Sequence, residues 1–143
     1  MEQSILIIDD STDIHRLIRS ALEEEPWQIE SAFDGPQGLE MAAAGRFDLI
    51  LLDLDLPSMN GFEVCRHLKA DPYTSRAAVI FLTTLSGTDE RACALKLGAA
   101  DYLTKPFDGE NLKTRIGQEL RTQRPAYKLA TFANNVQFTN RLR

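Results

Sequence analysis

Polar side chains that could act together follow separate short apolar segments of this sequence. They are Asp9 and Asp10, Asp53, Thr83 and Thr84, and Lys105. Two carboxylates about 4 Å apart repel by roughly 4 kcal/mol at an effective dielectric near 20, so a cluster of three ionised acids needs a cation. Because oxygen ligands favour a hard ion, the aspartates predict a Mg²⁺ site, with Mg²⁺ as the expected cofactor.

The same residue types are suited to phosphoryl transfer. Asp53 could be the nucleophile that forms an acyl phosphate. Mg²⁺ and the Lys105 ammonium would neutralise the oxygens of the transferred group, and a threonine hydroxyl could bond to the product phosphoryl. The pattern therefore predicts that Asp53, Lys105 and a hydroxyl of Thr83 or Thr84 carry the chemistry.

Each residue alone has a structural explanation. Asp10 could cap a helix, Asp53 and Asp55 could be turn residues before Pro57, and a lone lysine is usually a surface charge. Thr83 and Thr84 are also good strand residues. The functional interpretation rests on the combination, because four accidents at four strand ends are improbable.

Alternating elements must position these side chains. Short apolar segments predict strands at 4–8, 27–33, 47–52, 79–82 and around 102–103. Helical periodicity predicts helices over 12–24, 36–44, a segment containing Phe62, Cys65 and Leu68, 88–97 and 109–121. This alternation predicts a three-layer α/β sandwich with a parallel sheet, in which the carboxyl ends of the strands share one edge. Periodicity alone leaves the strand order open.

The composition is that of one globular domain. The chain has 143 residues, of which 43% are hydrophobic and 26% charged, and a net charge of -5. No apolar run is long enough to cross a bilayer, and the amino-terminal residues lack the features of a signal peptide. Cys65 and Cys93 are expected to be buried thiols. We therefore expect a cytoplasmic protein without membrane contact.

Charge is unevenly distributed. Residues 1–120 hold 11 Lys or Arg and all 21 acids, whereas residues 121–143 hold five Lys or Arg and no acid. The acidic body argues against direct nucleic-acid binding by this domain. Residues 122–143 are expected to be a basic linker or tail, with a helix and a mobile linker both open.

Four segments together resemble the receiver domain of two-component response regulators. They are ILIIDDS, DLILLDLDLPSMNGFEV, VIFLTT and GAADYLTKPF. The resemblance covers about residues 4–121 and implies a doubly wound (βα)5 flavodoxin-like fold with sheet order 2-1-3-4-5. It implies that residues 1–121 form the receiver domain and that Asp53 is the modified residue.

The resemblance also assigns roles to individual positions. Asp10 would bind Mg²⁺ directly, Asp9 mostly through water, and Asp55 through its backbone carbonyl, while Asp53 would be both ligand and phosphoacceptor. Thr83 would contact the phosphoryl group, and Lys105 would pair with it beside a cis bond to Pro106. Tyr102 matches the aromatic switch residue, which turns inward when Thr83 moves toward the phosphate.

The function that follows is a signalling switch, not an enzyme acting on other substrates. A sensor histidine kinase or phosphotransfer protein would donate the phosphoryl group. Phosphorylation would change the surface formed by the fourth helix, fifth strand and fifth helix, and so control an output domain or partner protein. Homodimerisation through that surface is one expectation. The receiver resembles those found before diguanylate cyclase domains or in hybrid sensor proteins, and we expect an output domain after Arg143.

Two positions depart from the family pattern. Thr84 stands where Ala or Gly is more usual, which would tighten access to the acyl phosphate. Asp55 adds an acid two residues beyond the acceptor, and its charge is expected to alter the rate of dephosphorylation.

Other interpretations fit less of the sequence. Asp53 and Asp55 resemble the opening motif of haloacid-dehalogenase-type phosphatases, but Pro57 and the position after the third strand do not match. A flavodoxin-like cofactor binder would need a phosphate-cradling loop where Asp9 and Asp10 stand. His15 and His67 are each expected on a solvated helix face.

Overall fold

A computed structural model of the chain describes residues 2–85 and 87–122. The sequence predicts a tail over residues 122–143. All of it after Thr122 lies outside the described residues. The elements are β1 Ser4–Ile8, α1 Thr12–Ala21, β2 Gln28–Ala32, α2 Gly35–Ala44, β3 Leu49–Asp53, α3 Gly61–Ala70, the 3-10 turn η1 Thr74–Arg76, β4 Ala78–Thr83, α4 Thr88–Lys96, β5 Asp101–Thr104 and α5 Gly109–Thr122.

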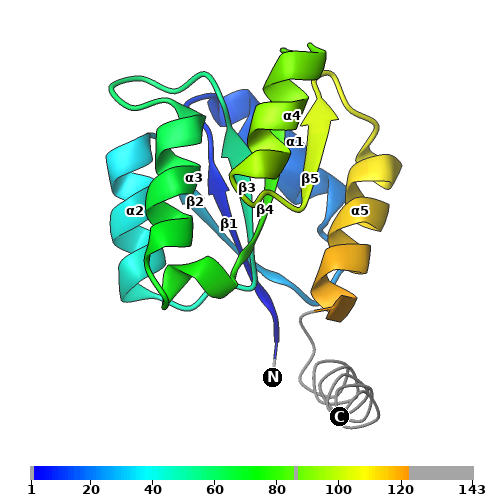
Figure 1. Cartoon of the computed structure of the whole chain (residues 1–143). Helices are drawn as coiled ribbons and strands as arrows, with labels where there is room; N and C mark the ends of the chain where they lie inside the picture. Colours follow the sequence, from blue (N-terminus) through cyan, green and yellow to red (C-terminus); the bar gives the residue numbers. More distant parts are fainter. Residues whose placement is uncertain (1, 86, 123–143) are drawn as a thin grey trace, which may run out of the picture.

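The five strands form one parallel sheet in the order β2-β1-β3-β4-β5 (Figure 1). The predicted (βα)5 fold and strand order are therefore confirmed. Strands β1, β3 and β4 are buried along nearly their whole length, as expected for continuous apolar segments covered on both faces.

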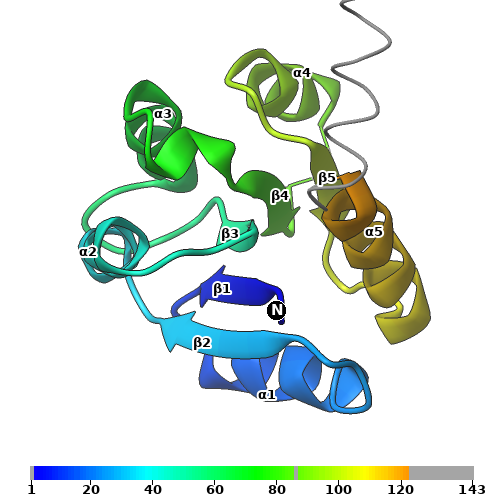
Figure 2. The same cartoon turned by 90° about the horizontal axis from the view of Figure 1, so that it is seen from below.

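The sheet separates two hydrophobic layers. Helices α2, α3 and α4 cover one face and α1 and α5 cover the other, as the view along the sheet shows (Figure 2). Alternate residues of each strand point to opposite layers: Leu6 and Ile8 pack on the first, Ile5 and Ile7 on the second. The central strands are thus held from both sides.

The observed boundaries differ most from prediction at the end of α1. The periodic pattern predicts a helix to residue 24, but α1 ends at Ala21 with Leu22 as its C-cap. Three consecutive acids, Glu23 to Glu25, follow, and negative charge is unfavourable at a helix carboxyl terminus. Gly98, with φ 99°, follows the C-cap of α4, a position where the left-handed backbone favours glycine. None of the helices in the described residues has the length and apolar character needed to span a membrane.

Candidate functional site

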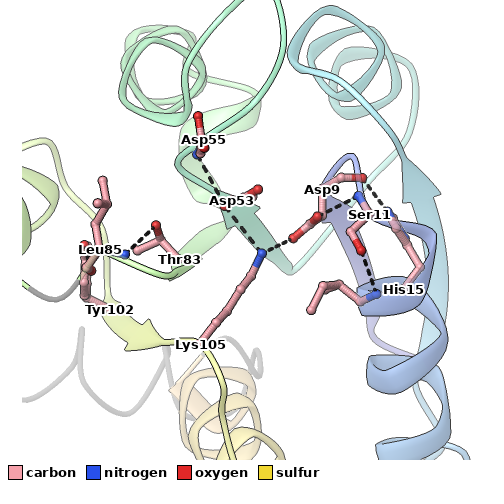
Figure 3. Close-up of polar contacts among 10 residues, drawn as sticks. Asp9, Ser11, His15, Asp53, Asp55, Thr83, Leu85, Tyr102 and Lys105 are labelled. Atoms are coloured by element: carbon pink, nitrogen blue, oxygen red, sulfur yellow. Dashed lines mark hydrogen bonds and ion pairs between the residues drawn. The ribbon is translucent and has the colours of Figure 1, made fainter.

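Strand register brings the predicted site residues to one edge of the sheet. Ile8 lies opposite Leu52, so Asp9 and Asp53 follow at the same level. Asp53 in turn lies opposite Leu82, next to Thr83. Thr83 pairs with Thr104, which places Lys105 just beyond that edge. Figure 3 shows these side chains gathered at the carboxyl end of the sheet.

Three carboxylates form the acid cluster: Asp9, Asp10 and Asp53. One oxygen from each lies within 4.8 Å of the others. Asp9 and Asp53 are buried, whereas Asp10 is exposed, so the cluster opens to solvent on one side. Only hard oxygen donors are present, which suits Mg²⁺, an ion that typically takes one or two carboxylates and keeps several waters.

Lys105 supplies the positive charge beside the acid cluster. Its Nζ lies 2.7 Å from Asp9 Oδ2 and 3.5 Å from Asp53 Oδ1 (Figure 3). The Lys105–Pro106 peptide bond is cis, as expected. With 12% of its side chain exposed, Lys105 is screened little by water, so its attraction to both acids is stronger than that of a surface ion pair.

The environment of Asp53 favours its protonated form. Burial, followed by the charge of Asp9, raises the pKa of Asp53 from 3.8 to about 6. The Lys105 charge and a hydrogen bond from the backbone N–H of Asp55 to Asp53 Oδ1, 3.3 Å long, act in the opposite direction. The Lys105 charge therefore only partly offsets the cost of burying the Asp53 carboxylate. A further cation at the acid cluster would stabilise the ionised form.

Asp55 contributes to this arrangement through its backbone. Its side chain is exposed and lies outside the acid cluster, while its N–H donates to Asp53 (Figure 3). Thr84, the other departure from the family pattern, is also exposed.

Thr83 and Tyr102 meet at Leu85. The buried Thr83 hydroxyl oxygen accepts a hydrogen bond of 3.2 Å from Leu85 N, and the Tyr102 hydroxyl donates one of 2.5 Å to Leu85 O (Figure 3). Tyr102 is 1% exposed, so its side chain lies inward in this structure. The guanidinium of Arg91, from α4, lies 5.2 Å from the centre of its ring. Leu85, which precedes α4 in the chain, is thus hydrogen-bonded to both predicted switch residues, Thr83 and Tyr102.

Sequence reasoning missed Gly61. At this first residue of α3, an added Cβ would clash with Asp53 O and lie 2.7 Å from Leu54 Cα. Its N–H also donates to Leu54 O at 2.8 Å. Gly61 therefore allows α3 to begin directly against the backbone of Asp53. The Asn-Gly sequence signals a turn, but only the packing shows this close approach.

His15 corrects an expectation. It was predicted on a solvated helix face, but it is 4% exposed and its ring hydrogen-bonds to Asp9 O. His67 is exposed, as expected. Both thiols are free, and Cys65 is buried as expected, but Cys93 is exposed because it lies on the outer side of α4.

Comparisons with known proteins identify the kind of molecule this geometry belongs to. The family model described as response regulator receiver domain matches residues 5–117. The chain therefore belongs to the response regulator receiver domain family, whose members are signalling domains of two-component systems.

Individual relatives agree. The chain is 43% identical over 116 residues to response regulator PleD of Caulobacter vibrioides, covering 81% of this chain and 26% of PleD. It is 42% identical over 119 residues to response regulator ArlR of Staphylococcus saprophyticus, covering 83% of this chain and 53% of ArlR. This chain thus spans about a quarter and about half of the lengths of these two proteins.

A solved structure supports the same assignment. The BeF3-activated DrrB receiver domain superimposes with a TM-score of 0.76 at 30% identity, covering 85% of this chain and 99% of that one. Receiver domains bind Mg²⁺ at an acidic pocket, interact with histidine kinases and output domains, and are generally soluble. The acid cluster is the corresponding pocket here.

Proposed function

We propose that this chain is a Mg²⁺-dependent phosphorylation switch in which Asp53 accepts a phosphoryl group from a sensor histidine kinase or phosphotransfer protein. The observation that carries the proposal is the composition of the site. Asp53 lies beside two further carboxylates and 3.5 Å from the Lys105 ammonium, at the carboxyl edge of a parallel sheet. This is where ligands bind in open α/β sheets.

Each residue of the site has a task in the proposed transfer. A carboxylate oxygen of Asp53 forms the new bond to phosphorus, and the phosphorus–nitrogen bond of the donor phosphohistidine breaks. Lys105 neutralises charge on the phosphoryl oxygens. Asp9, Asp10, Asp53 and the Asp55 carbonyl would hold Mg²⁺, which would supply the remaining charge neutralisation. The chain catalyses only its own phosphorylation and dephosphorylation.

The proposed output begins at Thr83. Its hydroxyl would turn to donate to a phosphoryl oxygen and would no longer accept from Leu85 N–H, which would release one of the two hydrogen bonds that hold Leu85. Tyr102, which already lies inward, bonds to the same residue, so its hydrogen bond to Leu85 and the start of α4 would respond together. The α4-β5-α5 surface would then change its affinity for an output domain, a partner protein or a second copy of this chain.

The division of the chain belongs to the same proposal. The family match over residues 5–117 supports a receiver domain over 1–121, and we propose that the basic residues 122–143 are a linker or tail that leads to an output domain. A cytoplasmic location suits a domain that receives its signal from kinases.

Intact mass spectrometry tests the acceptor. The full chain is incubated with acetyl phosphate and Mg²⁺, with Asp53→Asn and Asp55→Asn in parallel. We expect one phosphoryl adduct on the wild type and on Asp55→Asn, none on Asp53→Asn, and none when EDTA is added beforehand. An adduct on Asp53→Asn, or none on a folded wild type that binds Mg²⁺, would contradict the proposal.

The same proteins discriminate the phosphatase alternative. A haloacid-dehalogenase-type enzyme needs a second acid beside its nucleophile, but the Asp55 side chain lies outside the acid cluster. We therefore expect no turnover of a generic phosphomonoester such as p-nitrophenyl phosphate. Steady turnover that Asp55→Asn abolishes would favour the phosphatase.

A further inference from the structure

One buried polar side chain next to the acid cluster has no part in the proposed transfer. His15 lies in α1, 4% exposed, with its ring centre 4.4 Å from that of Phe33. Figure 3 shows the ring reaching from α1 to the end of β1, where Asp9 begins the acid pair. A histidine at this depth requires hydrogen-bond partners, because unpaired buried polar atoms are costly.

Both ring nitrogens have such partners. Nε2 lies 2.7 Å from the backbone oxygen of Asp9, and Nδ1 lies 2.9 Å from Ser31 Oγ in β2. A carbonyl oxygen only accepts, so Nε2 must carry the proton and donate. The Ser31 oxygen accepts from Arg19 at 3.0 Å, which leaves the Ser31 hydroxyl proton free to donate to Nδ1. The partners thus assign the Nε2–H tautomer.

The Asp9 carbonyl belongs to the peptide group that joins Asp9 to Asp10. Rotation of this peptide would change the direction in which both carboxylates leave the backbone. The other hydrogen bonds of Asp9 do not involve its carbonyl group: its N–H donates to Ala32 O at 3.1 Å, its Oδ1 accepts from Ser11 N at 2.9 Å, and its Oδ2 accepts from Lys105 Nζ at 2.7 Å. His15 supplies the hydrogen bond to the remaining polar atom of the Asp9 backbone.

We propose that His15 is a positioning residue for the acid cluster. Its Nε2–H holds the Asp9–Asp10 peptide in the orientation that directs both carboxylates toward Asp53, and this raises the affinity for Mg²⁺. The inference rests on the proposed function, since it assumes that the acid cluster binds Mg²⁺. Partners that orient metal ligands typically change metal affinity by about 10–100-fold when they are removed.

Three substitutions separate this role from simple packing. His15→Gln places an amide N–H near the position of Nε2 and keeps the donor. His15→Leu fills similar space without a donor. Ser31→Ala removes the partner of Nδ1 and leaves the bond to Asp9. If His15 only fills space, Leu is the better replacement; if it positions Asp9, Gln is.

Isothermal titration calorimetry of the full-length variants with Mg²⁺ measures the effect, and thermal unfolding in EDTA checks the fold. We expect the Kd of His15→Leu to rise about tenfold or more, and those of His15→Gln and Ser31→Ala to stay within about threefold of wild type. Equal Kd values for Leu and wild type, or equal losses for Leu and Gln, would overturn the inference. A wild type that binds no Mg²⁺ would instead contradict the proposed function itself.

A measurement on the wild type remains decisive should His15→Leu fail to fold. Long-range ¹⁵N–¹H correlation spectra distinguish the two neutral tautomers of a histidine ring. We expect His15 to be protonated at Nε2, both before and after Mg²⁺ is added. A ring protonated at Nδ1 alone could not donate to Asp9, and its observation would overturn the inference.

Discussion

The two halves of the functional edge are built differently. The acid half comprises Asp9, Asp10, Asp53 and Lys105, and the α4 half comprises Leu85 and residues 87–96. In the acid half, Asp9 and Asp53 are buried, each accepts a hydrogen bond from the backbone N–H two residues further on, and both face the Lys105 ammonium. The α4 half is mostly exposed, including Leu85 at 44% and Leu95 at 50%.

Helix ends show the same contrast. Ser11, Asp34 and Asn60 each cap their helix with a side-chain hydrogen bond to the backbone, whereas Gly87, the N-cap of α4, has no side chain to make one. Helix α3 buries four residues, but α4 buries only Ala94. Elements with few buried contacts open at the lowest free-energy cost. The proposed chemistry therefore sits on the firmly held half, and the half proposed to move is the weakly held one.

The largest expected effect comes from removing the charge balance of the acid half. Lys105→Met leaves Asp9 and Asp53 facing each other without a buried cation. Without Mg²⁺ at pH 7.5, we expect the free energy of unfolding to fall by about 3–4 kcal/mol, near the lower end for breaking a buried ion pair. Urea denaturation measures it. Lys113→Met, which breaks contacts of 3.3 and 3.9 Å at the surface, is the control and should cost less than about 0.5 kcal/mol. If Lys105→Met and Lys113→Met lose equal stability, Lys105 does not offset the repulsion between Asp9 and Asp53.

An intermediate effect of opposite sign is expected from Asp53→Asn. The folded pKa of Asp53, about 6, lies above the unfolded value of 3.8, so its ionisation destabilises the fold. This cost is absent below about pH 4, grows as the pH rises toward 6, and is then constant. Without Mg²⁺, Asp53→Asn should be more stable than wild type by about 2–3 kcal/mol at pH 7.5 and by little at pH 4.

Urea titrations at several pH values test this, with the exposed Asp55→Asn as control. The control should change the free energy of unfolding by less than about 0.5 kcal/mol at pH 7.5. A constant difference between Asp53→Asn and wild type from pH 4 to 7.5 would contradict the assigned cause.

The smallest expected effect tests the α4 half. Gly87→Asn supplies a side-chain cap to α4, at the cost of moving the flexible Glu90 carboxylate that lies near the new Cβ. We expect a few tenths of a kcal/mol of stabilisation, seen as slower hydrogen exchange at the α4 amides. Asn60→Gly should speed exchange in α3 by a similar amount. If Gly87→Asn leaves hydrogen exchange in α4 unchanged, the absence of a side-chain N-cap is not the reason for the low stability of α4.

Much of this arrangement is readable in the sequence. Apolar segments ending in Asp9, Asp53, Thr83 and Lys105 predict both the parallel sheet and the edge where these residues meet. The missed features depend on approach between distant segments. The burial of His15 needs Phe33 and Ser31 beside it, and the requirement for Gly61 arises from the Asp53 backbone. The exposure of Cys93 is likewise decided by which face of α4 meets the core. The early end of α1 has a local cause, the three acids that follow it, which apolar periodicity alone does not register.

The contact of Gly61 with the Asp53 backbone has a mechanical consequence. Because no Cβ fits between them, the end of β3 and the first turn of α3 are in direct backbone contact and cannot move closer together. The backbone of α3 would therefore resist a displacement of Asp53 toward that helix. In the proposed switch, such a displacement would be passed across the sheet instead, through Thr83 and Leu85 to the start of α4.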